Sequence, residues 1–122
     1  PDNRSVTVTR LSGTPTTNND PELARRLNAV MKRELGEAAF EPFVQQNMGA
    51  EDFTYFVSEE TGVPGYYLAV GGTTPERIAA AEAGGPPIAG HHSPLFQVAP
   101  RESIVLGTRA MVAAVLDLAG TK

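Results

Sequence analysis

The feature that most constrains the fold is a short apolar run between two turns. Tyr66 to Val70 is almost continuously apolar, follows Pro64-Gly65, and is followed directly by Gly71-Gly72. A short run that is apolar at successive positions is typical of a central strand buried on both faces of a parallel sheet. The run therefore predicts an α/β protein in which helices cover a sheet.

Two longer segments have the spacing of helices that would cover such a sheet. From Asp20 to Leu35 apolar residues recur at helical spacing, Asn19 or Asp20 can cap the first turn, and Pro21 suits that turn. From Arg101 to Ala119 apolar residues cover more than one face. We therefore expect the second helix to be largely buried against the sheet. A shorter surface helix is expected over residues 75–83.

The first residues predict the end of a separate unit. Arg4 to Arg10 alternates valines with threonines, the pattern of a half-buried strand, and a linker-like stretch follows, with a boundary near Gly13. Because the chain begins with Pro1 rather than methionine, we expect it to be part of a longer protein. The compartment stays open, with the cytoplasm slightly favoured and export not excluded.

Charge and composition argue against two classes of partner. The 10 basic and 14 acidic residues give a net charge of −4 without any basic cluster, so nucleic acid is not expected. No apolar run approaches the ~20 residues that span a bilayer, so a membrane is not expected either. The chain has 0 cysteines, and it therefore has neither a disulfide nor a thiolate ligand.

Both histidines lie in one stretch, Gly90 to Phe96, between a glycine- and proline-rich run and the last helix. Neutral imidazole is the commonest protein ligand for transition metals, and loops held by rigid elements often carry functional groups. Neighbouring side chains of an extended chain point in opposite directions, so one of His91 and His92 at most would face a given metal. The alternative is that both are ordinary polar loop residues.

Two further stretches carry candidate site residues. Glu51 and Asp52 stand where a short helix would begin, either as ordinary acids at a helix start or as carboxylates beside a metal or substrate. Gly71 and Gly72 end the predicted strand, where ligands gather in open α/β sheets and where glycine lets a substrate approach the backbone.

Taken together, these pieces resemble the C-terminal part of the two-metal amidohydrolase family of hippurate hydrolase, aminoacylase, indole-acetyl-amino-acid hydrolase and carboxypeptidase G. Each piece is weak alone, and the match rests on their order across nearly all of the chain. The matching segments are Pro15 to Leu23, Met48 to Phe53, Val63 to Gly65, Gly71-Gly72, His92 to Phe96 and the closing helix.

The resemblance implies a fold and a division into domains. It implies an α/β chain forming the C-terminal half of a zinc-exopeptidase-like three-layer catalytic domain. Residues 1–13 would be the last strand of an inserted lid or dimerisation domain, and residues 14–122 part of the catalytic domain. After the aromatic residue the chain departs from the family, since Gln97 to Pro100 replaces a stretch that is often acidic.

The resemblance also implies a reaction and one metal ligand. In an intact relative, two zinc or manganese ions activate water that hydrolyses the amide bond of an N-acyl amino acid or small peptide. His92 matches the final metal ligand, and His91 does not. Asn19, Glu51 and Asp52 match positions near the site, to which Gly71 and Gly72 are added. The other ligands and the general base have no counterpart here, so we expect no catalytic residue, no activity and no tightly bound metal in this chain alone.

Two other classes of protein fit the same residues. One is a non-catalytic binding or dimerisation module derived from the same fold, and the other is an unrelated α/β domain with chance matches. Half of a catalytic sheet would leave an open strand edge and an uncovered apolar surface. We therefore expect the chain to form a homodimer, otherwise to self-associate, or to pair with the missing half of the domain.

Overall fold

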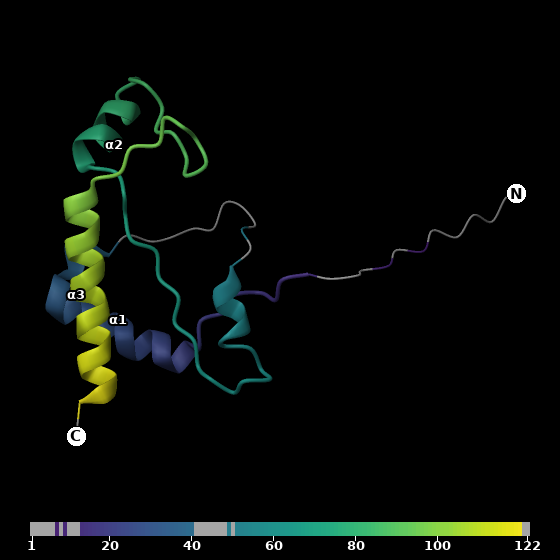
Figure 1. The fold of residues 1–122 in the computed structure, drawn as a ribbon. Coiled ribbons are helices and arrows are strands. Elements are labelled where there is room, and N and C mark those ends of the chain that lie inside the picture. The colour runs from purple at the N-terminus through teal and green to yellow at the C-terminus, as the bar shows by residue number, and fades with distance from the viewer. Residues whose placement is uncertain (1–6, 8, 10–12, 41–48, 50, 121–122) are drawn as a thin grey trace, which may run out of the picture.

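The computed structural model describes residues 7, 9, 13–40, 49 and 51–120. Figure 1 shows two long helices that cross, with a short helix beyond the start of the second. Over the described ranges no residue is in a strand, so the predicted α/β class and the zinc-exopeptidase-like three-layer arrangement are wrong for this part of the chain. The elements in order are α1 (Pro21–Leu35), the 3-10 turns η1 (Glu37–Ala39) and η2 (Asp52–Tyr55), α2 (Pro75–Glu82) and α3 (Pro100–Ala119).

Helix α1 begins and ends where the sequence predicts. The Asp20 carboxylate accepts hydrogen bonds from the backbone N–H groups of Glu22 at 3.1 Å and Leu23 at 2.7 Å, which satisfies two donors of the first turn. Gly36 follows the last turn with φ at 88°, a conformation that glycine adopts without strain. The cap is therefore Asp20 rather than Asn19, and the predicted helix is confirmed.

The core lies where α1 crosses α3. Leu27 and Met31 of α1 are buried against Ala110 and Ala114 of α3, and Tyr66 is among the partly buried residues packed around them. The alanines lack long side chains, so the two helix backbones approach closely at this point.

Two arginines fix the crossing at its edges. The Arg26 guanidinium contacts Asp117 twice, with Nε 2.6 Å from the carboxylate and Nη2 2.8 Å from the backbone carbonyl. Arg109 donates from Nη2 to the carbonyl of Glu34 at 2.8 Å, near the C-terminus of α1, where a positive charge is favourable. The two contacts join the start of α1 to the end of α3, and the end of α1 to the middle of α3.

The expected burial of the last helix is wrong. Beyond its α1-facing side, α3 carries large apolar side chains that are half or more exposed. The reason is the missing sheet, because the second apolar face of α3 has no layer to pack against in the described structure. These side chains are Ile104, Val105, Met111, Val112, Val115, Leu116 and Leu118.

The run Tyr66 to Val70, predicted to be a central strand, is a single segment between η2 and α2 that passes beside α3 (Figure 1). Tyr66 and Leu68 pack against the core, while the intervening Tyr67 lies against the ring of Phe53. Side chains thus alternate as in a strand. A strand also needs a neighbouring chain to complete its backbone hydrogen bonds, and the neighbours described here are helices and loops.

The remaining expectations concern the short helix, the N-terminal strand and membrane-spanning segments. The shorter helix expected over 75–83 is confirmed as α2. The strand expected from Arg4 to Arg10, and with it the lid-domain assignment of residues 1–13, lies almost entirely outside the described residues. Within the described ranges no helix is long and apolar enough to span a membrane.

Candidate functional site

The amide side chain of Asn19 makes two hydrogen bonds with the backbone of Tyr67. The Tyr67 N–H donates to Asn19 Oδ1 at 2.6 Å, and Asn19 Nδ2 donates to the Tyr67 carbonyl at 2.9 Å. A paired residue of an antiparallel sheet makes the same two bonds, so Asn19 takes the place of a neighbouring strand. One residue further on, the backbone N–H of Asp20 donates to the Gly65 carbonyl at 2.8 Å. These three bonds hold the segment beside the start of α1.

Tyr67 connects Asn19 to the acidic stretch. Its ring centre lies 5.5 Å from that of Phe53. Partial burial first, and then the hydrogen bond and the charge of the Glu51 carboxylate, raise the pKa of the Tyr67 hydroxyl above its ordinary value. The structure therefore brings together two of the residues that the sequence singles out, Asn19 and Glu51, on either side of Tyr67.

The two acidic side chains lie at the surface. Glu51 precedes the 3-10 turn η2 and Asp52 begins it, and both are exposed. The turn is anchored instead by Thr54, which is 2% exposed and donates its hydroxyl to the Glu51 carbonyl at 3.0 Å. The backbone of Glu51 is thus fixed, while its carboxylate and that of Asp52 remain accessible to solvent and to a ligand.

Gly71 and Gly72 lie between α3 and the histidine loop. The Gly71 carbonyl accepts a hydrogen bond from Ser103 Oγ at 2.8 Å, and the Gly72 carbonyl accepts one from the Ala99 N–H at 2.8 Å. A Cβ atom at Gly72 would lie 3.2 Å from Val98 Cγ2, whereas none of the described atoms lies within 4 Å of one at Gly71. A side chain at Gly72 would therefore require Val98 to shift by a few tenths of an ångström, whereas Gly71 has open space around it.

The histidine loop is a pair of tight turns. The Ser93 N–H donates to the Gly90 carbonyl and the Phe96 N–H to the Ser93 carbonyl, both at 3.0 Å. Ser93 Oγ also accepts from the Leu95 N–H at 3.1 Å. Ser93 thus fixes the backbone directly after His92.

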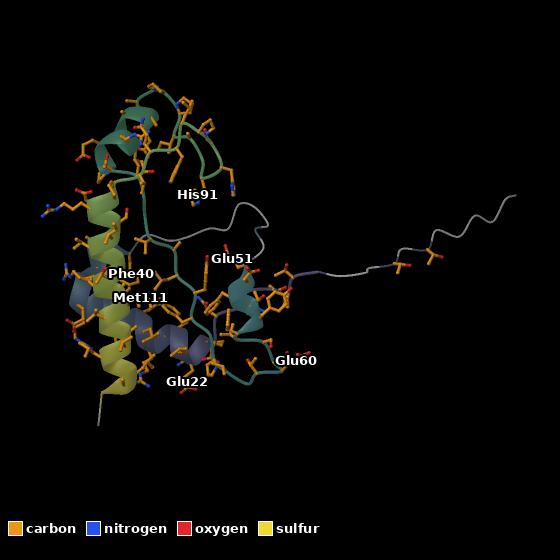
Figure 2. All side chains as sticks on the ribbon, in the orientation of Figure 1. Glu22, Phe40, Glu51, Glu60, His91 and Met111 are labelled. Atoms are coloured by element: carbon orange, nitrogen blue, oxygen red, sulfur yellow. The ribbon has the colours of Figure 1, made fainter. Side chains whose placement is uncertain are left out.

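The two imidazoles have different surroundings. The ring centre of His91 lies 5.2 Å from that of Phe96, and both histidines are exposed. Among the described residues, no hydrogen bond, ion pair or aromatic contact involves His92. Figure 2 shows His91 on the loop between α2 and α3, and Glu51 on a separate segment at η2. His91, and not the imidazole that the resemblance assigns to a metal, makes this ring contact.

The described residues do not complete a metal site. Among them, no group of three or more histidines, cysteines, aspartates or glutamates is placed to hold a metal ion. A catalytic zinc has three protein ligands in addition to water. His92 can supply one ligand, and any further ligands have to come from residues other than those described.

The sequence patterns do not indicate two residues that contact the site. Tyr67 lies in a run that is interpreted as uniformly apolar, although its hydroxyl gives it a polar end. Ser103 is a serine in the first turn of a helix, which is ordinary.

The sequence also does not indicate an open groove of about 530 Å³ between α1 and α3. The groove is lined by Arg33, Arg109 and other residues, and by none of the predicted site residues. It depends on the crossing of the helices, which no local pattern specifies.

Comparison of the chain with protein-family models, with curated proteins and with solved structures gives no match.

Proposed function

We propose that the chain is part of a metal-dependent amidohydrolase that cleaves N-acyl amino acids or small peptides, and that His92 is one of its metal ligands. The observation that carries the proposal is the histidine loop. His92 is exposed, none of the hydrogen bonds, ion pairs or aromatic contacts among the described residues involves it, and the turn that follows it is fixed by Ser93. Such an arrangement holds an imidazole in a defined place and leaves its nitrogens available to a metal.

The cluster around Tyr67 supports the same proposal. Asn19 and Glu51 come from segments more than thirty positions apart in the sequence, and both meet at Tyr67. The exposed Glu51 carboxylate next to a tyrosine hydroxyl offers a polar wall for an amide substrate. Both polar atoms of the Asn19 amide form hydrogen bonds with the Tyr67 backbone, so the role of Asn19 is to position the tyrosine.

Nuclear magnetic resonance of the two histidines tests the metal assignment directly. The chain contains only 2 histidines, so each imidazole signal can be assigned from the His91→Ala and His92→Ala variants. When Zn²⁺ is titrated into the chain, we expect the His92 signals to shift first, with weak affinity because further ligands are absent from the described residues. A first response at His91, or equal responses, contradicts the assignment.

Kinetics of the complete gene product tests the reaction. His92→Ala should lower both the metal content and the rate of N-acyl amino acid hydrolysis by orders of magnitude, because water activation and charge stabilisation both depend on the metal. His91→Ala is the matched control, and it should cost far less through its contact with Phe96. If His91→Ala loses metal and rate while His92→Ala keeps them, the metal ligand is His91, and the match of this loop to the family is displaced by one residue. If neither variant has an effect, the loop has no catalytic role.

One observation favours a second candidate function, a non-catalytic binding or dimerisation module. It is the row of exposed apolar side chains along α3, which is typical of an interaction surface. A module would bind no metal in the complete gene product, whereas the hydrolase would. Metal analysis of the purified gene product therefore separates the two proposals.

A further inference from the structure

The run Tyr66 to Val70 has the composition of a segment that stacks with copies of itself. It contains aromatic and β-branched residues, and it has no charge, no proline and no glycine. Short windows of this composition are prone to form intermolecular β-sheet. The outer face of the run is accessible, since Tyr67 is 42% exposed and Ala69 is exposed as well. The run is therefore an aggregation hazard unless its backbone is protected.

One edge of the run is occupied by groups from the start of α1. In an extended chain the backbone groups of alternate residues point to the same edge, so those of Gly65 and Tyr67 face the same way. The Gly65 carbonyl accepts a hydrogen bond from the Asp20 N–H, and the Asn19 amide binds both the N–H and the carbonyl of Tyr67. A strand added at this edge would need the same three groups. The edge is therefore closed to another strand while Asn19 and Asp20 are in place.

Closing a single edge is sufficient to prevent stacking. In a growing β-stack each strand pairs with one chain above it and with another below it, so both of its edges are used. A segment with one closed edge ends the stack wherever it joins. Proteins protect edge strands in comparable ways, for example by covering the edge with a helix or a loop. In this chain the cover consists of one side chain and the first backbone N–H beside it.

We propose that Asn19, together with the Asp20 backbone, is an edge cap that keeps Tyr66 to Val70 from pairing with other copies of the chain. The Asn19 amide makes the two bonds that a residue of a neighbouring strand would make, but it offers no further edge on which another chain can pair. It therefore satisfies the Tyr67 backbone and ends the sheet at the same point. The proposal does not depend on the metal chemistry.

Aggregation kinetics of Asn19→Ala test the proposal. The variant should form thioflavin-binding β-sheet about tenfold faster than the parent chain, because the loss of two net hydrogen bonds raises the population of the open edge by about that factor. Asn28→Ala is the matched control. Asn28 also holds this segment, but it accepts a hydrogen bond from the Tyr66 hydroxyl and leaves the backbone edge closed. It should aggregate at a rate close to that of the parent chain.

A second substitution identifies the segment that aggregates. Ala69→Lys places a charge on the exposed face of the run, where it repels its own copies in a stack. Added to Asn19→Ala, it should return the rate to nearly that of the parent chain. The added lysine also reduces the net charge of −4, which by itself favours association, so a slower rate has to come from the position of the charge.

Circular dichroism before each run shows whether the variants are folded. Asn19→Asp loses only the bond to the Tyr67 carbonyl, so it should aggregate at an intermediate rate, and it takes the place of Asn19→Ala if that variant does not fold. Equal rates for the Asn19 and Asn28 variants overturn the proposal, because loss of stability alone would then explain aggregation. Failure of Ala69→Lys to slow the capless variant also overturns it, because another segment would then be responsible.

Discussion

Replacing Asn19 by alanine measures how strongly the segment 65–72 is held. The substitution removes two hydrogen bonds to the Tyr67 backbone, 2.6 and 2.9 Å long. Each neutral hydrogen bond contributes about 0.5–1.5 kcal/mol net to stability. Because Asn19 is exposed, water can reach the groups that are freed, so the loss belongs in the lower part of the combined range. We expect Asn19→Ala to lower the free energy of unfolding by about 1–2 kcal/mol.

Asn18→Ala is the control for that measurement. Asn18 is the same residue type in the adjacent position, is exposed, and has no hydrogen-bond partner among the described side-chain contacts. Urea unfolding followed by circular dichroism at the helix band gives the free energy for both variants and for the parent chain. Asn18→Ala should change it by less than about 0.5 kcal/mol, as surface substitutions usually do.

One outcome would contradict this prediction. If Asn19→Ala and Asn18→Ala unfold at the same urea concentration with the same slope, the Asn19 amide does not hold the segment. The tyrosine resonances give a second readout, because loss of the contact should change the environment of Tyr67 and leave that of Tyr55, on the far end of η2, unchanged.

Two further predictions concern the same segment. Gly65→Ala should destabilise the chain by about 1–3 kcal/mol, because its Cβ would lie 2.7–2.9 Å from the side chain of Val57, whereas Gly71→Ala, with open space around it, should have little effect in the same urea assay. The raised pKa of Tyr67 means that the folded chain holds this proton more tightly, so its contribution to stability is present below pH 10 and is lost as the pH rises through the folded value. Thermal melts between pH 8 and 11 should show that loss, Tyr67→Phe should reduce it, and an unchanged slope in that variant would disprove the assignment.

Local signals explain why the helices are predictable from the sequence. The cap at Asp20, the stop at Gly36 and the apolar spacing of α1 act between residues within a few positions of one another. Local signals do not specify what packs against a helix. The pattern of α3 shows that it is apolar on more than one face, but not whether a sheet, a second copy or water meets the second face. The predicted burial of α3 fails at this step.

Local sequence signals predict one part of the candidate site and do not predict the other. The position of the histidine stretch between a glycine- and proline-rich run and the last helix predicts a loop, and the structure contains one. Asn19 and Glu51 both contact Tyr67 because segments that are far apart in the sequence pack together. No short-range pattern encodes that packing. The resemblance places these residues near one another without giving the contact, and the contact assigns Asn19 a positioning role.

The run Tyr66 to Val70 shows why a strand cannot be assigned from composition alone. Its side chains alternate as in a strand, and at Tyr67 the backbone bonds to Asn19 in place of a neighbouring strand. Residues 66, 68 and 70 direct their backbone groups to the other edge, where the described residues provide no backbone partner. A strand is defined by hydrogen bonds between chains, so the same residues are a strand beside a partner and a single extended segment without one. The neighbouring backbone, and not the apolar run itself, therefore determines whether this segment belongs to a sheet.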